Sequence, residues 1–220
     1  MKLAQAGVKM GCHHCKGSLA CCRVHGSGSS RDVEQALQLA RESAAQGSKY
    51  GLYMMGYFIM GLGSVGPALC AKYGFKEKEE DERAAVYFRQ ACDLGLVEAF
   101  NELAFLLQNS NSVAKDTKEA FRLYTIAAGF GHPAANEGVG YFLLRGIGTS
   151  VDKAAAGRHL KVAAELGCVA APRMLLECED PSPDSSAKKV RLPLWMRVHK
   201  HVITTSHTQF CCDAAAAARA

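Results

Sequence analysis

The sequence lacks any apolar run that approaches the roughly 18 residues needed to cross a membrane, so we expect no membrane span. The N-terminal stretch MKLAQAGVKM also lacks the apolar core of a signal peptide, which is about 7–15 residues long. The net charge is only +5, which is weak evidence for nucleic-acid binding because that function usually needs clustered Lys and Arg. We therefore expect no nucleic-acid partner either.

Motifs of catalytic sites are missing as well. The sequence has no phosphate-binding P-loop, no Gly-rich dinucleotide fingerprint and no G-x-S-x-G nucleophile motif. Apolar residues nevertheless make up 49% of the chain, which is enough for a packed core. We expect a folded protein that is not an enzyme and needs no cofactor.

Cysteine, in contrast, is abundant, with ten residues in the chain. Secreted proteins use cysteines as disulfide staples, whereas a reducing compartment keeps them as thiols. Because no signal peptide is visible, we expect reduced thiols and a cytoplasmic location. The secretory pathway becomes the alternative if the natural N-terminus lies upstream of Met1.

An internal repeat organises most of the sequence. Glycines recur in one register at spacings of 36, 48, 36 and 36 residues, so one unit carries a 12-residue insertion: Gly11, Gly47, Gly95, Gly131 and Gly167. Small residues stand four positions before each glycine (Gly7, Ser43, Ala91, Ala127 and Ala163) and four positions after it (Cys15, Gly51, Ala99, Ala135 and Ala171). Tyr or Phe, or Cys21 in the first unit, stands ten positions after it in all but the last unit. The repeat therefore sets the expected structure.

Each repeat unit has the features of a helical hairpin. Asp32, Asp116 and Asp152 are suited to cap the N-terminus of a first helix, since a carboxylate accepts a bond from an unpaired amide. That helix should stop near the registered glycine, the residue best suited to a left-handed helix end. A second helix should follow, with Pro133 near its start in one unit, and it should end at a glycine pair such as Gly146 and Gly148.

A single hairpin cannot bury its apolar face, so we expect the units to stack into an all-α, right-handed α-solenoid. The expected helices lie near 12–25, 32–46, 48–60, 79–94, 96–108, 116–130, 132–145, 152–166 and 168–178, with the end of a further helix within 2–10 and the insertion between 63 and 80.

The unit resembles the Sel1-like repeat, which is related to the tetratricopeptide repeat. The resemblance is clearest in AFRLYTIAAGFGHPAANEGVGYFLLRGIGTSVD, residues 120–152, and in HGSGSSRDVEQALQLARESAAQG, residues 25–47. It covers residues 4–178 and departs in the 48-residue unit, in the loop NSNSVAKD, and in the last unit, where Pro172 falls inside the expected second helix. The resemblance implies a scaffold for protein–protein interactions. Cysteine-rich relatives join the two helices of each unit by a disulfide bond between cysteines seven residues apart. Here the partner position of Cys92 is Ala99, so we expect no such set of disulfides.

The stretch MGCHHCKGSLACCRVHG, residues 10–26, taken alone resembles a small zinc site. The repeat register instead places Cys15 in a small core position and Cys21 in an aromatic core position. Free cysteine behaves as a small apolar residue, and these positions suit one. We therefore expect core cysteines and no metal ligands.

A broken row of basic residues on the first helices is the candidate binding site. These residues stand six or nine positions before a registered glycine and would share a helix face: Arg41, Arg89, Arg122, Arg158 and Lys161. First helices of such arrays commonly line the concave surface, so this basic stripe would suit an acidic peptide or tail of a protein partner. The alternative is a solvated polar face balanced by Glu42, Asp93 and Glu165.

Three segments make up the predicted organisation: a repeat array over 1–179, a linker over 180–189 and a basic tail over 190–220 that is disordered or docks on the array. The array begins in mid-unit, which suggests a fragment of a longer chain. The predicted function is a non-catalytic adaptor. A regulatory or targeting segment of a larger enzyme is the alternative, and a cysteine-based metal or redox protein is disfavoured by the register.

Overall fold

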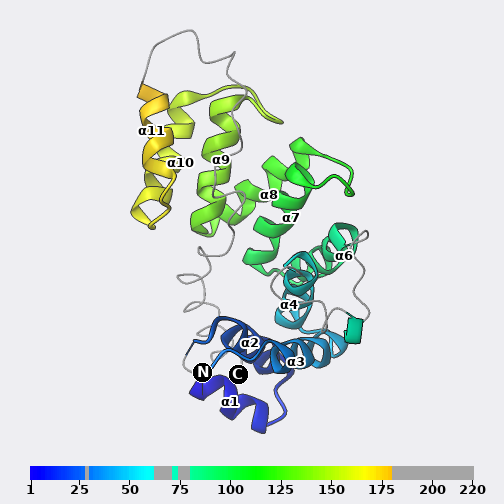
Figure 1. Cartoon of the computed structure of the whole chain (residues 1–220). Coiled ribbons are helices and arrows are strands. Elements are labelled where there is room, and N and C mark those ends of the chain that lie inside the picture. The colour runs from blue at the N-terminus through cyan, green and yellow to red at the C-terminus, as the bar shows by residue number, and fades with distance from the viewer. Residues whose placement is uncertain (28–29, 62–70, 74–79, 180–220) are drawn as a thin grey trace. The chain divides into compact units, whose positions relative to one another are not determined.

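A computed structural model describes residues 1–27, 30–61, 71–73 and 80–179 of the chain. The predicted linker and tail (180–189 and 190–220), most of the insertion and Gly28 lie outside these residues. Within them, the secondary structure is helical throughout, in agreement with the expected all-α fold (Figure 1). The helices are α1 (Lys2–Lys9), α2 (His13–His25), α3 (Val33–Ala45), α4 (Lys49–Met60), α6 (Glu80–Asp93), α7 (Val97–Asn109), α8 (Thr117–Gly129), α9 (Pro133–Arg145), α10 (Lys153–Glu165) and α11 (Ala171–Glu179).

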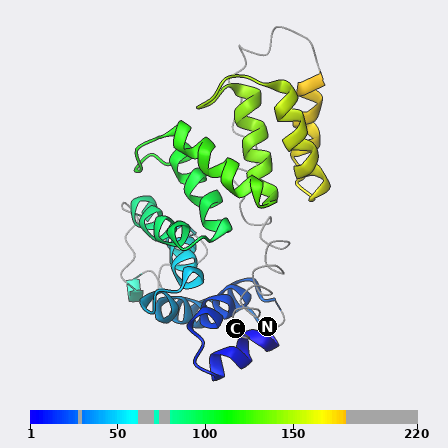
Figure 2. The same cartoon turned by 180° about the vertical axis from the view of Figure 1, so that it is seen from behind.

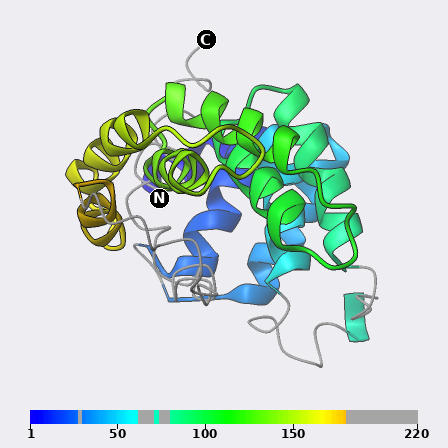
Figure 3. The ribbon, with the colours of Figure 1, turned by 90° about the horizontal axis from the view of Figure 1, so that it is seen from above.

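The described residues form two compact units, which we call unit 1 (1–115) and unit 2 (116–179). In unit 1, each helix packs on the next along the chain, and the second helices α2 and α4 also pack on each other. Unit 2 repeats this scheme: Figure 2 shows α9 between α8 and α10, and Figure 3 shows α10 and α11 side by side. Each unit is therefore a stack of helical hairpins.

Aspartates begin the first helices as the sequence predicts. The carboxylate of Asp32 accepts a hydrogen bond from the Gln35 amide at 3.0 Å, and Asp116 and Asp152 cap α8 and α10 in the same way. Replacing such a cap with alanine typically costs about 1 kcal/mol of stability. The registered glycines end the first helices with positive φ, which only glycine adopts without strain: Gly11, Gly47, Gly95, Gly131 and Gly167.

Small residues on both sides of the registered glycine lie between the two helices of a hairpin. A Cβ added to Gly7 would lie 2.3 Å from Sγ of Cys15, and a Cβ added to Gly51 would lie 2.5 Å from the carbonyl carbon of Ser43. These positions therefore bring the two helices into direct contact. The largest fully buried side chains include Phe58, Phe88 and Phe142, which fill the remaining space.

Two details of the second helices differ from the sequence prediction. Pro172 does not interrupt a helix, because α11 begins only at Ala171 and the proline stands in its first turn, where no amide hydrogen bond is lost. His132 has a capping role that the sequence analysis does not predict, because its Nδ1 accepts a hydrogen bond from the Ala135 amide at the N-terminus of α9. Ser48 and Cys12 hold the same capping position in α4 and α2.

Candidate partner-binding surface

The residues of the predicted basic stripe are all exposed on first helices. Arg41 lies on α3 and Arg89 on α6 in unit 1, while Arg122 lies on α8 and Arg158 and Lys161 lie on α10 in unit 2. Their exposure leaves them accessible to a partner. The two units differ, however, in what surrounds these cations.

Unit 1 contains an open pocket of about 560 Å³ beside Arg41. Its walls come from the first helices α3 and α6, and Leu52 and Met55 of α4 contribute apolar surface. The full lining is Arg41, Ala44, Ala45, Leu52, Met55, Arg83, Val86, Tyr87 and Gln90. We call this the unit 1 pocket; it combines an apolar surface with two guanidinium groups.

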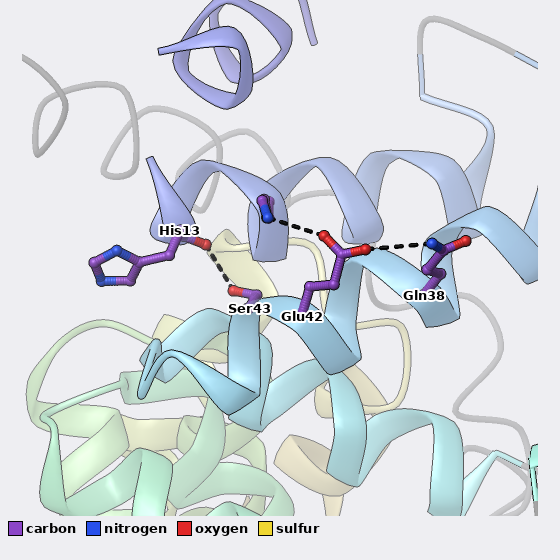
Figure 4. A network of polar contacts seen from close by, with 5 residues as sticks. His13, Gln38, Glu42 and Ser43 are labelled. Atoms are coloured by element: carbon purple, nitrogen blue, oxygen red, sulfur yellow. Dashed lines mark hydrogen bonds and ion pairs between the residues drawn. The ribbon is translucent and has the colours of Figure 1, made fainter. Parts of the chain in front are cut away.

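The charge of Arg41 is not cancelled by its sequence neighbour Glu42. The Glu42 carboxylate accepts a hydrogen bond from Nζ of Lys16 at 2.9 Å and another from Nε2 of Gln38 at 3.3 Å (Figure 4). The hydrogen bond from Lys16 lowers the pKa of Glu42, so this carboxylate is ionised and forms an ion pair with Lys16 of α2. The Arg41 guanidinium instead lies over the ring of Tyr73, with Cζ 5.3 Å from the ring centroid.

Arg83 is a pocket residue that the sequence prediction missed. It stands twelve positions before Gly95, one helical step of three residues earlier than the positions that define the stripe. Arg83, Val86 and Gln90 are spaced i, i+3 and i+7, which places them on one face of α6. The same spacing argument that selected Arg89 could have extended the stripe to Arg83.

In unit 2, part of the predicted stripe is already paired. The Arg122 guanidinium donates two hydrogen bonds to the Glu119 carboxylate, at 2.7 Å and 2.6 Å. Glu119 stands three residues earlier on α8, so this pair was visible in the sequence. Because the pairing offsets the charge of Arg122, we regard unit 1 as the stronger candidate site.

The cysteine-rich stretch occupies the positions that the repeat register predicts. Cys15 and Cys21 are each 1% exposed and form part of the core of unit 1. Cys12 caps the N-terminus of α2, whereas His25 ends the helix and packs edge-on against Tyr57. His25 stands 13 positions after Cys12, which corresponds to about 20 Å along the helix, so these two side chains cannot share one metal ion. Among the described residues, no group of three or more potential ligands could hold a metal.

A buried polar network in unit 2 was also not predicted. Nδ2 of Asn136 on α9 donates to the carbonyl of Ala128 at 3.4 Å, and its Oδ1 lies 3.0 Å from Nδ1 of His159 on α10. Burial, and secondarily the charge of Arg158, lowers the pKa of His159. This network ties α9 to both neighbouring first helices.

Glu137 is the most unusual titratable residue of unit 2, because it is only 4% exposed and its Oε1 has no hydrogen-bond partner. Burial raises its pKa to about 7, although the thiol of Cys168 donates a hydrogen bond that opposes the shift. Burial, and then the nearby Glu137, raises the pKa of Cys168 to about 12. We interpret this pair as a feature of the core, since neither side chain reaches the surface.

Stacked helical hairpins with glycine ends define the class of α-helical repeat proteins. The family model of the Sel1 repeat matches residues 9–48, 49–96, 97–129 and 133–168, which together exceed half of the sequence. The chain belongs to the Sel1 repeat family. No curated protein sequence matches it.

Solved structures with the same fold include other Sel1 repeat proteins. A Sel1 repeat protein from Oxalobacter formigenes superposes with a TM-score of 0.61 at 21% identity, over 76% of this chain and 62% of the other. A protective antigen of uropathogenic Escherichia coli strains, which displays a Sel1-like repeat fold, gives 0.51 at 18% identity, over 96% of this chain and 46% of the other. The chain thus spans less than two thirds of the length of either relative.

Sel1 repeat proteins are generally non-catalytic scaffolds that mediate protein interactions. This general role agrees with the predicted adaptor function. No helix in the described part of the chain has both the length and the apolar character that a bilayer-spanning segment requires.

Proposed function

We propose that this protein is an adaptor that binds an acidic segment of a protein partner at the unit 1 pocket. The observation that carries the proposal is the position of Arg41 and Arg83 at the edges of a pocket whose remaining surface is largely apolar. A segment with a large apolar side chain between carboxylates would match both features.

The chemistry of the pocket favours carboxylates over other polar groups. A guanidinium presents several donors in a planar arrangement that matches a carboxylate, and both arginines come from different helices. Val86, which is 52% exposed, offers apolar surface, and Leu52 and Met55, which are 7% and 5% exposed, line the pocket. Burying one leucine-sized side chain there contributes about 1.5–3 kcal/mol.

Arg89, which also lies in unit 1, supplies a further cation for a longer acidic tail, while Arg158 and Lys161 of unit 2 stay predicted cations of the stripe. Exposed ion pairs each contribute little to affinity, about 0–1 kcal/mol, so we assign them a role in attraction and orientation. A regulatory or targeting segment of a larger enzyme would use the same surface.

The experiment is a binding titration with short fluorescein-labelled peptides in which Asp and Glu flank a Leu or Phe. We expect saturable binding that weakens as salt is added, because the contact is electrostatic in part. Arg41→Glu should weaken binding at least about tenfold, which corresponds to 1.4 kcal/mol. Arg83→Gln should weaken it less, since it removes one charge without reversing it.

Arg173→Glu is the matched control, because it changes net charge by the same amount at an exposed position on α11, in unit 2. It should leave the affinity within about twofold of the original protein, as surface changes away from a site usually do. Equal binding of peptides with Ser in place of Asp and Glu, or undiminished binding by Arg41→Glu, would refute the proposal.

A further inference from the structure

Cys12 and Cys15 lie in contact at the start of α2, in a part of unit 1 that the unit 1 pocket does not use. Sγ of Cys12 accepts a hydrogen bond from the Cys15 amide at 3.3 Å. Residues three apart on a helix have Cβ atoms about 5–6 Å apart, and the extended φ and ψ of Cys12 aim its side chain back over the first turn. Because a disulfide needs Cβ atoms about 3.5–4.5 Å apart, a small tightening of this first turn is what brings the two sulfurs together.

The two thiols differ in their accessibility to solvent, which sets the order in which they can react. Cys12 is partly exposed at the N-terminal end of the helix, so an oxidant in solution can reach its sulfur. Cys15 is 1% exposed, and burial, with the Cys12 thiol as a further cause, raises its pKa to about 12. Cys12 is thus the thiol that can attack an external disulfide, and Cys15 is the one that can resolve the product.

We propose that Cys12 and Cys15 form a reversible disulfide when the protein meets a low-molecular-weight disulfide such as oxidised glutathione. The Cys12 thiolate attacks one sulfur of the oxidant, the oxidant's S–S bond breaks, and one glutathione thiolate leaves and takes up a proton. Cys15 then loses its proton and attacks Sγ of Cys12, which releases the second glutathione. Two thiols are oxidised and one glutathione disulfide is reduced to two thiols, so the exchange balances.

The proposed disulfide modifies a scaffold protein and gives it no catalytic role. It is a covalent bond between two thiols, and two thiols alone do not form the metal site considered in the sequence analysis. Since the Cys15 sulfur lies against Gly7 of α1, turning it toward Cys12 moves an atom that takes part in the contact between α1 and α2.

The sequence offers a convenient test, because trypsin should release both cysteines in one peptide, residues 10–16, and Cys21 and Cys22 in the next, residues 17–23. The full chain is treated with excess oxidised glutathione, quenched in acid, alkylated and digested. We expect peptide 10–16 to lose two hydrogens and to resist alkylation, at a rate at least about tenfold above any change in peptide 17–23, whose cysteines are both buried. Dithiothreitol should restore both thiols.

Two variants test the order of the steps. Cys15→Ala fits its core position, which Ala99, Ala135 and Ala171 fill in other units, and it should accumulate a stable glutathione adduct on Cys12. Cys12→Ser retains a helix cap like that of Ser48 and should form no disulfide. A peptide 10–16 that stays fully alkylated, or that stops at the mixed disulfide in the unaltered protein, would overturn the proposal, as would an unmodified Cys12 in Cys15→Ala.

Discussion

The first two hairpins of unit 1 and the α8–α9 hairpin of unit 2 solve the same packing problem with different residues. In α1–α2 and α3–α4 a glycine faces a larger residue across the two helices, with Gly7 against Cys15 and Gly51 against Ser43, whereas the third hairpin of unit 1, α6–α7, has buried alanines at both positions. In the α8–α9 hairpin of unit 2, both positions hold alanine, and both alanines are fully buried. The comparison shows that the contact between the two helices of a hairpin limits the combined size of the two residues that form it. Within that limit, either position can hold different small residues.

The largest effect should come from Gly51→Ala in unit 1. The new Cβ would lie 2.3 Å from the backbone nitrogen of Ala44, and the backbone cannot move aside as a flexible side chain can. We expect a loss of about 3 kcal/mol of stability or failure to fold, measured by urea unfolding. Gly157→Ala is its control, because that helical position has open space around the added Cβ. A small effect at Gly51 would show that the hairpin contact is looser than we describe.

A loss of stability nearly as large is expected above neutral pH from Glu137, which unit 2 buries at the position where unit 1 has Gly17, Tyr53 and Asn101. The folded pKa of about 7 exceeds the ordinary value of 4.5, so the folded state binds the proton more tightly. The corresponding stability is present below pH 4.5 and is lost as the pH rises toward 7, by about 3 kcal/mol in total.

The variant Glu137→Gln tests this assignment because it has no charge to bury. Its free energy of unfolding should exceed that of the unaltered protein at pH 8, and the difference should shrink toward pH 4.5. Parallel curves for the two proteins over this range would show that Glu137 is not the group responsible.

Gly7→Ala should have an intermediate effect, about 1–3 kcal/mol, since the added Cβ meets the Cys15 sulfur at 2.3 Å. Combining it with Cys15→Ala reproduces the alanine pair of unit 2 and should recover a substantial part of the loss. A double-mutant cycle measured by urea unfolding gives the coupling energy. Strict additivity of the two changes would contradict the size limit inferred from the comparison of the two units.

The smallest effect, and the only gain, is expected from Gly157→Ala on α10. With nothing within 4 Å of the added Cβ, alanine should stabilise the helix by about 0.5–1 kcal/mol through its higher helix propensity. Thermal unfolding would detect this as a higher midpoint. A lower midpoint would mean that other atoms crowd the added Cβ on α10, which would contradict the open space around Gly157.

Much of this architecture is predictable from the sequence, because one period carries caps, small contacts and helix ends together. The aspartate caps and the left-handed glycines are local features, and all of those in the described residues lie where the register places them. Cys15 and Cys21 could be assigned to the core for the same reason. The start of α11 could not be predicted, since nothing in the nearby sequence shows that Pro172 belongs to the first turn of this helix.

The candidate site was only partly predictable. Arg41 follows from helical spacing, but the unit 1 pocket depends on how α3, α4 and α6 pack, which periodicity does not specify. Glu137 was missed because a carboxyl at a core position has no sequence signal apart from its register. The function of the stripe as a binding surface, with Arg89, Arg122, Arg158 and Lys161, stays a prediction.

The most direct test of the binding proposal follows methyl signals in NMR spectra while an acidic peptide is added. Met55 lines the unit 1 pocket, whereas Met174, which is equally buried, lies on α11 of unit 2 and serves as the internal control. We predict that the Met55 methyl signal shifts in proportion to peptide occupancy while that of Met174 does not, and that Arg41→Glu moves the midpoint of the Met55 titration to a peptide concentration at least about tenfold higher. Saturable peptide binding that leaves Met55 unperturbed would contradict the assignment of this pocket as the partner-binding site.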